Sequence, residues 1–361
     1  MHHLVRRLMS TASKSTSQSL QKVAFFSARS YEKDYFNRFN DKSPQDKKLE
    51  FDYYSEELTA RTARLVHDAG TACAFVNDKL DEACLKTLKD NGVQLLALRS
   101  AGFSNVDLKA AEKHEIKVVR VPAYSPYAVA EHAMALLLTL NRHTHKAYNR
   151  TKEGNFKLSG LMGFDMHGKT MGIVGGGRIG QCLASICKGF GMKLFYYDIV
   201  EMKEMAEFGA KKVELDELLK ESDVVSLHCP LNEKTKHLMN KETLEKMKST
   251  AILINTGRGP LVDTKAVVEA LKNEKLGGLG LDVVEGEEEI FFKDHYDDVI
   301  KNDELNMLLT FPNVIVTGHQ AFFTQEAMEA IATNTIGNIL EIKETGKCKN
   351  EVKLDEGKEK K

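Results

Sequence analysis

A glycine-rich turn between an apolar strand and a helix constrains the fold of this 361-residue chain more than any other feature. Residues 175–180 read Gly-Gly-Gly-Arg-Ile-Gly; an apolar run precedes them, and apolar residues at helical spacing follow them. Asp198 stands at the end of the next apolar run, 194–197. Strand, glycine turn, helix, strand and acid in this order predict the dinucleotide-binding unit of a doubly wound α/β sheet.

The residue types in this unit each have a physical reason. Gly175 would form the tight turn, Gly177 would let the backbone approach a pyrophosphate, and Gly180 would let the helix pack on the strand. The Asp198 carboxylate can accept hydrogen bonds from both ribose hydroxyls, whereas it would repel a 2′-phosphate at a cost of about 1–3 kcal/mol. No basic residue follows in 199–201, so we predict NAD rather than NADP as the cofactor.

Length and composition exclude several classes of protein. A chain of this length can bury two cores, so two domains are expected. The net charge of −1 argues against a nucleic-acid partner. The six cysteines show no CxxC pair, which is typical of reduced thiols in an intracellular protein and predicts no metal site. The longest apolar run, 128–140, is too short to span a bilayer.

The two ends of the chain differ from the rest. Residues 1–21 contain no acid, and basic residues lie between apolar ones at helical spacing before a Ser-rich stretch. This pattern predicts a presequence for the mitochondrial matrix; the alternative is a disordered tail on a cytoplasmic protein. The mixed-charge run 343–361 predicts a solvated end, with a flexible tail over 347–361.

Apolar runs and helical patterns alternate along the chain, which predicts parallel sheets with crossover helices. We expect strands at 23–26, 72–76, 95–98 and 117–121, and a helix over 80–91, in a first α/β domain. A long apolar helix over 127–148 would connect it to the nucleotide unit. After Asp198 we expect strands at 224–227, 252–255, 280–282 and 314–317, and a helix over 264–273.

Polar side chains follow several of these strands, and the carboxyl ends of parallel strands meet at one edge of a sheet. Arg258, Glu285, Glu287 and His319 come after successive strands. An arginine fork can hold a carboxylate, and a histidine beside an acid can exchange a proton with a carbonyl oxygen during hydride transfer to a keto acid. Each residue alone could be a loop ion pair, a structural histidine or a solvated acid; their shared edge favours the catalytic interpretation.

The motifs around these residues resemble the D-isomer-specific 2-hydroxyacid dehydrogenase family, and most closely its fermentative, NAD-dependent D-lactate dehydrogenase branch. The resemblance covers residues 22 to 350. It implies a Rossmann nucleotide domain, 124–319, inserted into a discontinuous flavodoxin-like substrate domain, 22–123 and 320–346, with closure near Pro122 and Gly318. The motifs that carry it are 98–107, 121–126, 129–132, 226–230, 255–259 and 318–321.

The resemblance also implies roles for individual residues. Arg258, Glu287 and His319 would be catalytic, and its spacing selects Glu287 over Glu285. The substrate would be bound by the Ala101 and Gly102 amides and by Tyr124. Val284 departs from the family, where an aromatic residue is usual. The implied cofactor contacts are Gly175, Gly177, Arg178, Ile179, Gly180, Asp198, Cys229, Pro230, Thr235, Thr256, Gly257 and Asp282.

The expected activity is therefore reversible hydride transfer between NADH and pyruvate, giving D-lactate. Two alternatives stay open: a hydroxypyruvate or glyoxylate reductase of the same family, and a corepressor-like NAD-binding protein on the same scaffold. His143 and His145 lack a third metal ligand nearby, and His132 reads as a packing or hinge residue. The family implies a homodimer or homotetramer, for which the segment 149–166 would suit an interface.

Overall fold

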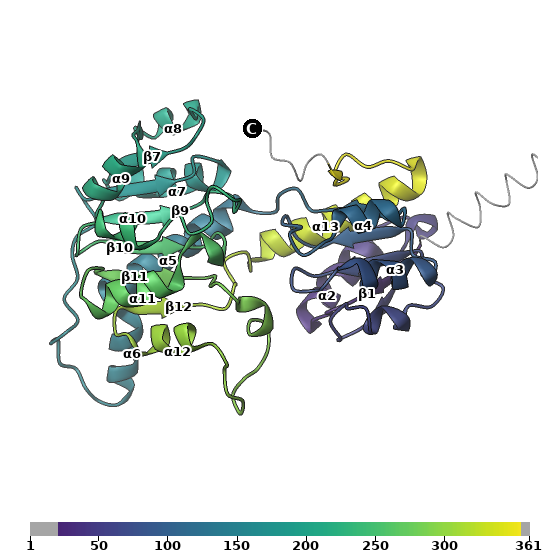
Figure 1. Cartoon of the computed structure of the whole chain (residues 1–361), viewed down its shortest axis with the longest axis horizontal. Coiled ribbons are helices and arrows are strands. Elements are labelled where there is room, and N and C mark those ends of the chain that lie inside the picture. Colours follow the sequence, from purple (N-terminus) through teal and green to yellow (C-terminus); the bar gives the residue numbers. More distant parts are fainter. Residues whose placement is uncertain (1–20, 355–361) are drawn as a thin grey trace, which may run out of the picture. The chain divides into compact units, whose positions relative to one another are not determined.

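The computed structural model describes residues 21–354, which divide into two units (Figure 1). The first unit consists of the described residues up to Ser125 and those from Thr324 onward, and the second comprises Pro126–Phe323. The second unit is therefore inserted in sequence into the first. Each unit contains one parallel sheet, so the predicted fold class of two doubly wound α/β domains is confirmed.

The sheet of the first unit has five parallel strands in the order β2-β1-β3-β4-β5, the flavodoxin-like order. The central strands are buried along their whole length, which explains why they read as continuous apolar runs. The strands are β1 (Lys22–Phe25), β2 (Glu50–Tyr53), β3 (Thr71–Ala74), β4 (Leu95–Leu98) and β5 (Lys117–Val119).

Helices cover both faces of this sheet. One face packs against α3 (Glu82–Asp90) and α4 (Leu108–Lys113), and the other against α2 (Ser30–Asp41) and α13 (Gln325–Thr345). Helix α13, yellow in Figure 1, returns from the end of the chain to the strands formed at its start. Short 3₁₀ turns η1 (Gln45–Lys47) and η2 (Thr62–Leu65) complete the unit.

The sheet of the second unit has seven parallel strands in the order β12-β11-β10-β9-β6-β7-β8. The chain runs outward from β6 to β8 and then restarts on the other side of β6 with β9, which creates the switch point where such folds bind ligands. The strands are β6 (Thr170–Val174), β7 (Lys193–Tyr197), β8 (Lys211–Lys212), β9 (Val224–Leu227), β10 (Ile252–Asn255), β11 (Gly278–Leu281) and β12 (Val314–Val316).

Two apolar cores lie on the two faces of this sheet. One contains side chains from α5 (Pro126–Arg142), α7 (Arg178–Gly189) and α8 (Lys203–Glu207). The other contains side chains from α9 (Leu215–Glu221), α10 (Lys241–Glu245), α11 (Thr264–Lys272) and α12 (Asp303–Thr310). The remaining elements are α6 (Thr144–Lys152), η3 (Gly259–Leu261) and η4 (Glu287–Glu289).

The structure differs from the sequence-based expectations in two segments. The prediction of one helix over 127–148 is wrong, because His143 adopts a left-handed conformation (φ 49°) and separates α5 from α6. The prediction of a solvated end from residue 343 is also wrong for its first part. Helix α13 continues to Thr345, the side chains of Cys348 and Val352 are buried, and Glu351 forms an antiparallel bridge with Val119.

Three further expectations concern membrane helices, the cysteines and the ends of the chain. None of the helices within residues 21–354 is long and apolar enough to cross a bilayer. All six cysteines are free thiols. The predicted presequence falls on residues 1–20, and the last part of the predicted tail on 355–361, both outside the described residues.

Candidate active site

The register of the second sheet brings the ends of five strands to one edge. Val174 pairs with Leu227, Leu227 with Asn255, Asn255 with Leu281, and Leu281 with Val316. The loops that follow these residues therefore begin side by side. They carry the glycine turn, Arg258, Asp282 with Glu287, and His319.

His319 and Glu287 form a close pair at this edge. The imidazole Nδ1 lies 2.6 Å from Oε1 of Glu287, and the side chains are 18% and 13% exposed. The other carboxylate oxygen accepts the Val284 N–H at 2.7 Å, which fixes the orientation of Glu287. An ionised carboxylate only accepts hydrogen bonds, so Nδ1 carries the hydrogen and Nε2 is left to exchange a proton with a ligand.

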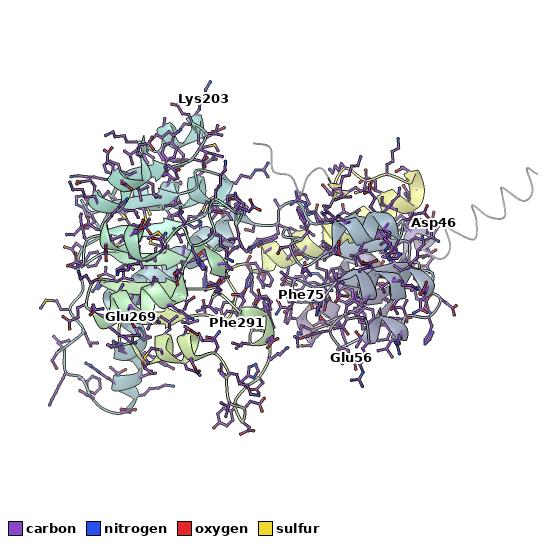
Figure 2. All side chains as sticks on the ribbon, viewed as in Figure 1. Asp46, Glu56, Phe75, Lys203, Glu269 and Phe291 are labelled. Carbon is purple, nitrogen blue, oxygen red and sulfur yellow. The ribbon has the colours of Figure 1, made fainter. Side chains whose placement is uncertain are left out.

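The backbone around Glu287 is fixed by the core and by a second acid–histidine pair. Phe291, labelled in Figure 2, is 8% exposed and packs in the core of the second unit just beyond η4. Glu285 turns away from His319 and contacts Nε2 of His237 at 3.0 Å. Gly286 lies between the two acids in a left-handed conformation (φ 81°), which favours glycine and separates the two carboxylates.

Asp282 organises the chain that carries His319. Its backbone oxygen accepts the His319 N–H at 2.8 Å, and its carboxylate accepts the N–H groups of Gln320 and Ala321 at 2.9 and 2.8 Å. Thr317 Oγ1 donates to the same carboxylate at 2.6 Å. These contacts hold His319 in its left-handed conformation (φ 53°), which a residue with a side chain seldom adopts.

His132 on α5 joins this network, a contact that the sequence did not predict. The only proton of the Thr317 hydroxyl goes to Asp282, so the hydroxyl accepts from Nε2 of His132 at 3.0 Å. Nε2 also lies 3.3 Å from Asp282 Oδ1. Burial is the largest single influence on Asp282 and favours its neutral form, but the hydrogen bonds together lower its pKa.

Arg258 lies in a turn that Asn255 holds from the end of β10. The Asn255 side chain accepts the Gly257 N–H at 3.0 Å and donates to the Arg258 carbonyl at 2.9 Å. Arg258 Nη1 donates to the Gly257 carbonyl at 2.8 Å. At Gly259, a Cβ would lie 2.2 Å from the Val284 backbone, so only glycine lets this turn pack against the loop that carries Glu287.

The glycine turn has the close contacts that its sequence predicts. A Cβ on Gly175 (φ 103°) would lie 2.6 Å from the backbone of His228 and Cys229, and one on Gly180 would lie 2.1 Å from the Gly175 carbonyl. Gly177 is the N-cap of α7. The first turn of α7, with Arg178 and Ile179, therefore presents unpaired backbone N–H groups where a phosphate could bind.

The acid at the end of β7 is tied to this turn. Asp198 accepts the Gly176 N–H at 2.8 Å through one oxygen and the Val200 N–H at 3.1 Å through the other. Both carboxylate oxygens have further lone pairs with which ribose hydroxyls could bond. The neighbouring Ile199 is 84% exposed and carries no charge.

The other predicted cofactor residues lie after β9 and β10. Burial raises the pKa of Cys229 to about 11, so this side chain is a neutral thiol at physiological pH. Thr235 Oγ1 donates to the Pro230 carbonyl at 2.6 Å and orders the turn between them. Thr256 Oγ1 is buried and has no hydrogen-bond partner among the described residues, as expected for a group that a ligand would satisfy. These features fit a dinucleotide.

Two predicted site features remain. The three predicted substrate-binding residues, Ala101, Gly102 and Tyr124, belong to the first unit. Ala101 and Gly102 lie in the loop that follows β4. No group of three or more His, Cys, Asp or Glu residues within 21–354 is arranged to hold a metal.

Sequence comparisons identify relatives of this chain. Residues 134–321 match the family described as D-isomer specific 2-hydroxyacid dehydrogenase, NAD binding domain. The chain is 50% identical over 329 residues to 2-hydroxyacid dehydrogenase A of Aspergillus oryzae, which covers 91% of this chain and 94% of that protein.

Solved structures show the same likeness over both units. The structure of apo D-lactate dehydrogenase from Escherichia coli matches with a TM-score of 0.84 and 42% identity, covering 92% of this chain and 99% of that one. The structure of a pyruvate reductase of Chlamydomonas reinhardtii matches with a TM-score of 0.85 and 43% identity, covering 91% and 98%.

Proposed function

Because this chain belongs to the D-isomer-specific 2-hydroxyacid dehydrogenase family and carries its NAD-binding domain, we propose that it interconverts pyruvate and D-lactate. The chain is an NAD-dependent dehydrogenase; the choice of pyruvate and of the D isomer is the proposal. Two structural relatives, a D-lactate dehydrogenase and a pyruvate reductase, support pyruvate as the keto acid.

The contact between His319 and Glu287 carries the proposed mechanism. With Nδ1 bonded to the acid, Nε2 of His319 would donate a proton to the carbonyl oxygen of pyruvate. NADH, when bound, supplies the hydride that the carbonyl carbon accepts, and the alcohol of lactate results. Glu287 would stabilise the imidazolium before the transfer and orient the ring throughout. In the reverse direction Nε2 takes the proton from the hydroxyl.

Arg258 is the proposed partner of the substrate carboxylate, because a guanidinium can bind both carboxylate oxygens. The Ala101 and Gly102 amides are proposed to bind the carboxylate as well, and Tyr124 to limit the size of the substrate. On the cofactor, the α7 N-terminus would bind the pyrophosphate and Asp198 the ribose hydroxyls.

Two finer proposals concern the setting of the enzyme. We propose that residues 1–21 direct it to the mitochondrial matrix, which a fusion of this segment to a fluorescent protein tests.

We also propose a homodimer, because α6 and the segment after it expose large apolar side chains. A Leu158→Asp variant should then be monomeric in light scattering, whereas the unchanged chain should be a dimer. The exposed side chains are Tyr148, Phe156, Leu158 and Met162.

Loss of NADH absorbance tests the proposed function, with the purified chain and pyruvate, hydroxypyruvate and glyoxylate offered separately. D- and L-lactate are then offered with NAD. Fastest turnover of pyruvate, with only D-lactate oxidised, would support the proposal. A tenfold or greater preference for another keto acid would instead assign the hydroxypyruvate or glyoxylate activity, and NADH binding without turnover would favour a corepressor-like role.

A further inference from the structure

Three consecutive carbonyl groups of the loop after β4 are each held by a hydrogen bond. The Ser100 carbonyl accepts the Val121 N–H at 3.1 Å. The Ala101 carbonyl accepts from Nη1 of Arg120 at 2.9 Å, and the Gly102 carbonyl accepts from Oγ of Ser100 at 2.7 Å. The peptide planes on both sides of Ala101 are therefore fixed from the carbonyl side.

The orientation of the carbonyl groups sets the orientation of the amides. In a trans peptide the C=O and the following N–H point in opposite directions. The Ala101 N–H therefore points away from Val121, and the Gly102 N–H points away from Arg120. Neither N–H donates a hydrogen bond to another residue in the described chain, so both are available to an anion.

Arg120 is itself held by the segment that the sequence suggested was a tail. The Arg120 N–H donates to the Asn350 carbonyl at 3.1 Å, and the Arg120 carbonyl accepts from the Asn338 side chain at 2.8 Å. The side chains of Asn338 and Asn350 bond to each other at 2.7 Å. The bridge between Val119 and Glu351 adds a backbone connection beside them.

We propose that Arg120 is a positioning residue that aims the Gly102 N–H at the substrate carboxylate, and that Asn338 and the segment around Asn350 hold Arg120 in place. This inference rests on the proposed function, in which the Ala101 and Gly102 amides bind that carboxylate. A charge-assisted bond from an amide depends on direction. A free Ala101 carbonyl would let the peptide plane rotate and weaken this bond without affecting the cofactor.

Steady-state kinetics of Arg120→Gln and Arg120→Lys test this role in the full-length chain. The unchanged chain is first assayed with the three keto acids, and the preferred one is then used for every variant. Glutamine is too short to reach the Ala101 carbonyl, so KM for the keto acid should rise about tenfold, while KM for NADH stays within about twofold. Lysine retains a donor and should restore KM to within about threefold of the unchanged enzyme.

Two further variants separate this role from general folding effects. Arg64→Gln changes an exposed arginine of the same unit and should leave both KM values unchanged. Asn338→Ala removes the bond to the Arg120 carbonyl and should raise KM for the keto acid in the same direction, which tests the inference even if Arg120→Gln folds poorly.

The outcomes distinguish the inference from the proposed function. A rise in KM for the keto acid with rescue by lysine supports it. An unchanged KM in both Arg120→Gln and Asn338→Ala overturns it while the dehydrogenase activity stands, and so does a loss of kcat alone, which would indicate a structural role. If the unchanged chain reduces no keto acid, the proposed function fails and the inference falls with it.

Discussion

The Glu285 carboxylate lies 3.0 Å from Nε2 of His237, whereas Glu287, two residues later, lies 2.6 Å from Nδ1 of His319. The two acids are neighbours in sequence, but each serves a different histidine because Gly286 turns the chain between them. The pairs also differ in exposure. The side chains of Glu285 and His237 are 37% and 35% exposed, whereas those of Glu287 and His319 are 13% and 18% exposed. They offer a matched comparison of a half-buried and a more exposed acid–histidine contact.

Glu287→Gln and Glu285→Gln should therefore have very different effects on reduction of the keto acid. Without the Glu287 carboxylate no anion stabilises the imidazolium form of His319, and kcat should fall by about a hundredfold or more. Loss of the exposed Glu285 charge should change kcat by less than about fivefold. Similar kcat values for the two variants would contradict the assignment of Glu287.

Arg258→Ala should raise KM for the keto acid and lower kcat. The guanidinium is the proposed clamp for the carboxylate, so its loss should reduce kcat/KM at least about tenfold. Arg258→Lys keeps the charge but cannot bind both carboxylate oxygens in the way a guanidinium does. Its kcat/KM should therefore lie between those of Arg258→Ala and the unchanged enzyme. If kcat/KM in Arg258→Ala stays within tenfold of the unchanged enzyme, the carboxylate is bound elsewhere.

Asp198 should determine the preference for NAD. Asp198→Ser removes the repulsion of a 2′-phosphate, and Ile199→Arg adds a cation at a position already exposed to solvent. The double variant should lower the ratio of kcat/KM for NADH over NADPH by at least about tenfold, a change of ~1.4 kcal/mol. Ile199→Arg alone is the control and should change the ratio less, because the carboxylate remains. An unchanged ratio in the double variant would remove Asp198 from the explanation of cofactor choice.

The sequence predicts the sheets well because their central strands are buried on both faces. Residues 95–98 are apolar throughout, and 252–255 are three apolar residues followed by the buried Asn255; the observed strands have the same bounds. The sequence does not predict the edge strands β2 and β8, because an edge strand need not be a continuous apolar run. Strand β8 consists of two lysines. The sequence also does not indicate the helix break at His143, because glycine rather than histidine is typical of the left-handed backbone conformation found there.

The candidate site likewise contains some residues that the sequence indicates and others that only the structure identifies. The strand-end rule indicates that Arg258, Glu287 and His319 share one edge, since parallel strands bring their ends together. The contacts of His132 depend on how α5 packs across the sheet, and no local pattern encodes that packing. The sequence does not indicate the role of Asn350 for a different reason. The charged residues around it predict a solvated tail, whereas the segment pairs with β5.

His228 should make the second unit sensitive to acid. It follows β9 beneath the glycine turn, and its Nε2 contacts Ser226 Oγ at 2.8 Å. Burial lowers the pKa of His228 from 6.5 to about 4. Between these two values the unfolded chain binds a proton that the folded chain does not, so the free energy of unfolding should fall as the pH falls through this window.

The expected loss is about 2 kcal/mol between neutral pH and about pH 5. Urea unfolding at several pH values would measure it, with His228→Gln as the variant that lacks the titrating group and His167→Gln, an exposed histidine of the same unit, as the control. His228→Gln should lose most of this dependence on pH, whereas His167→Gln should keep it. An equal slope in both variants would place the acid sensitivity at another residue and remove His228 as its cause.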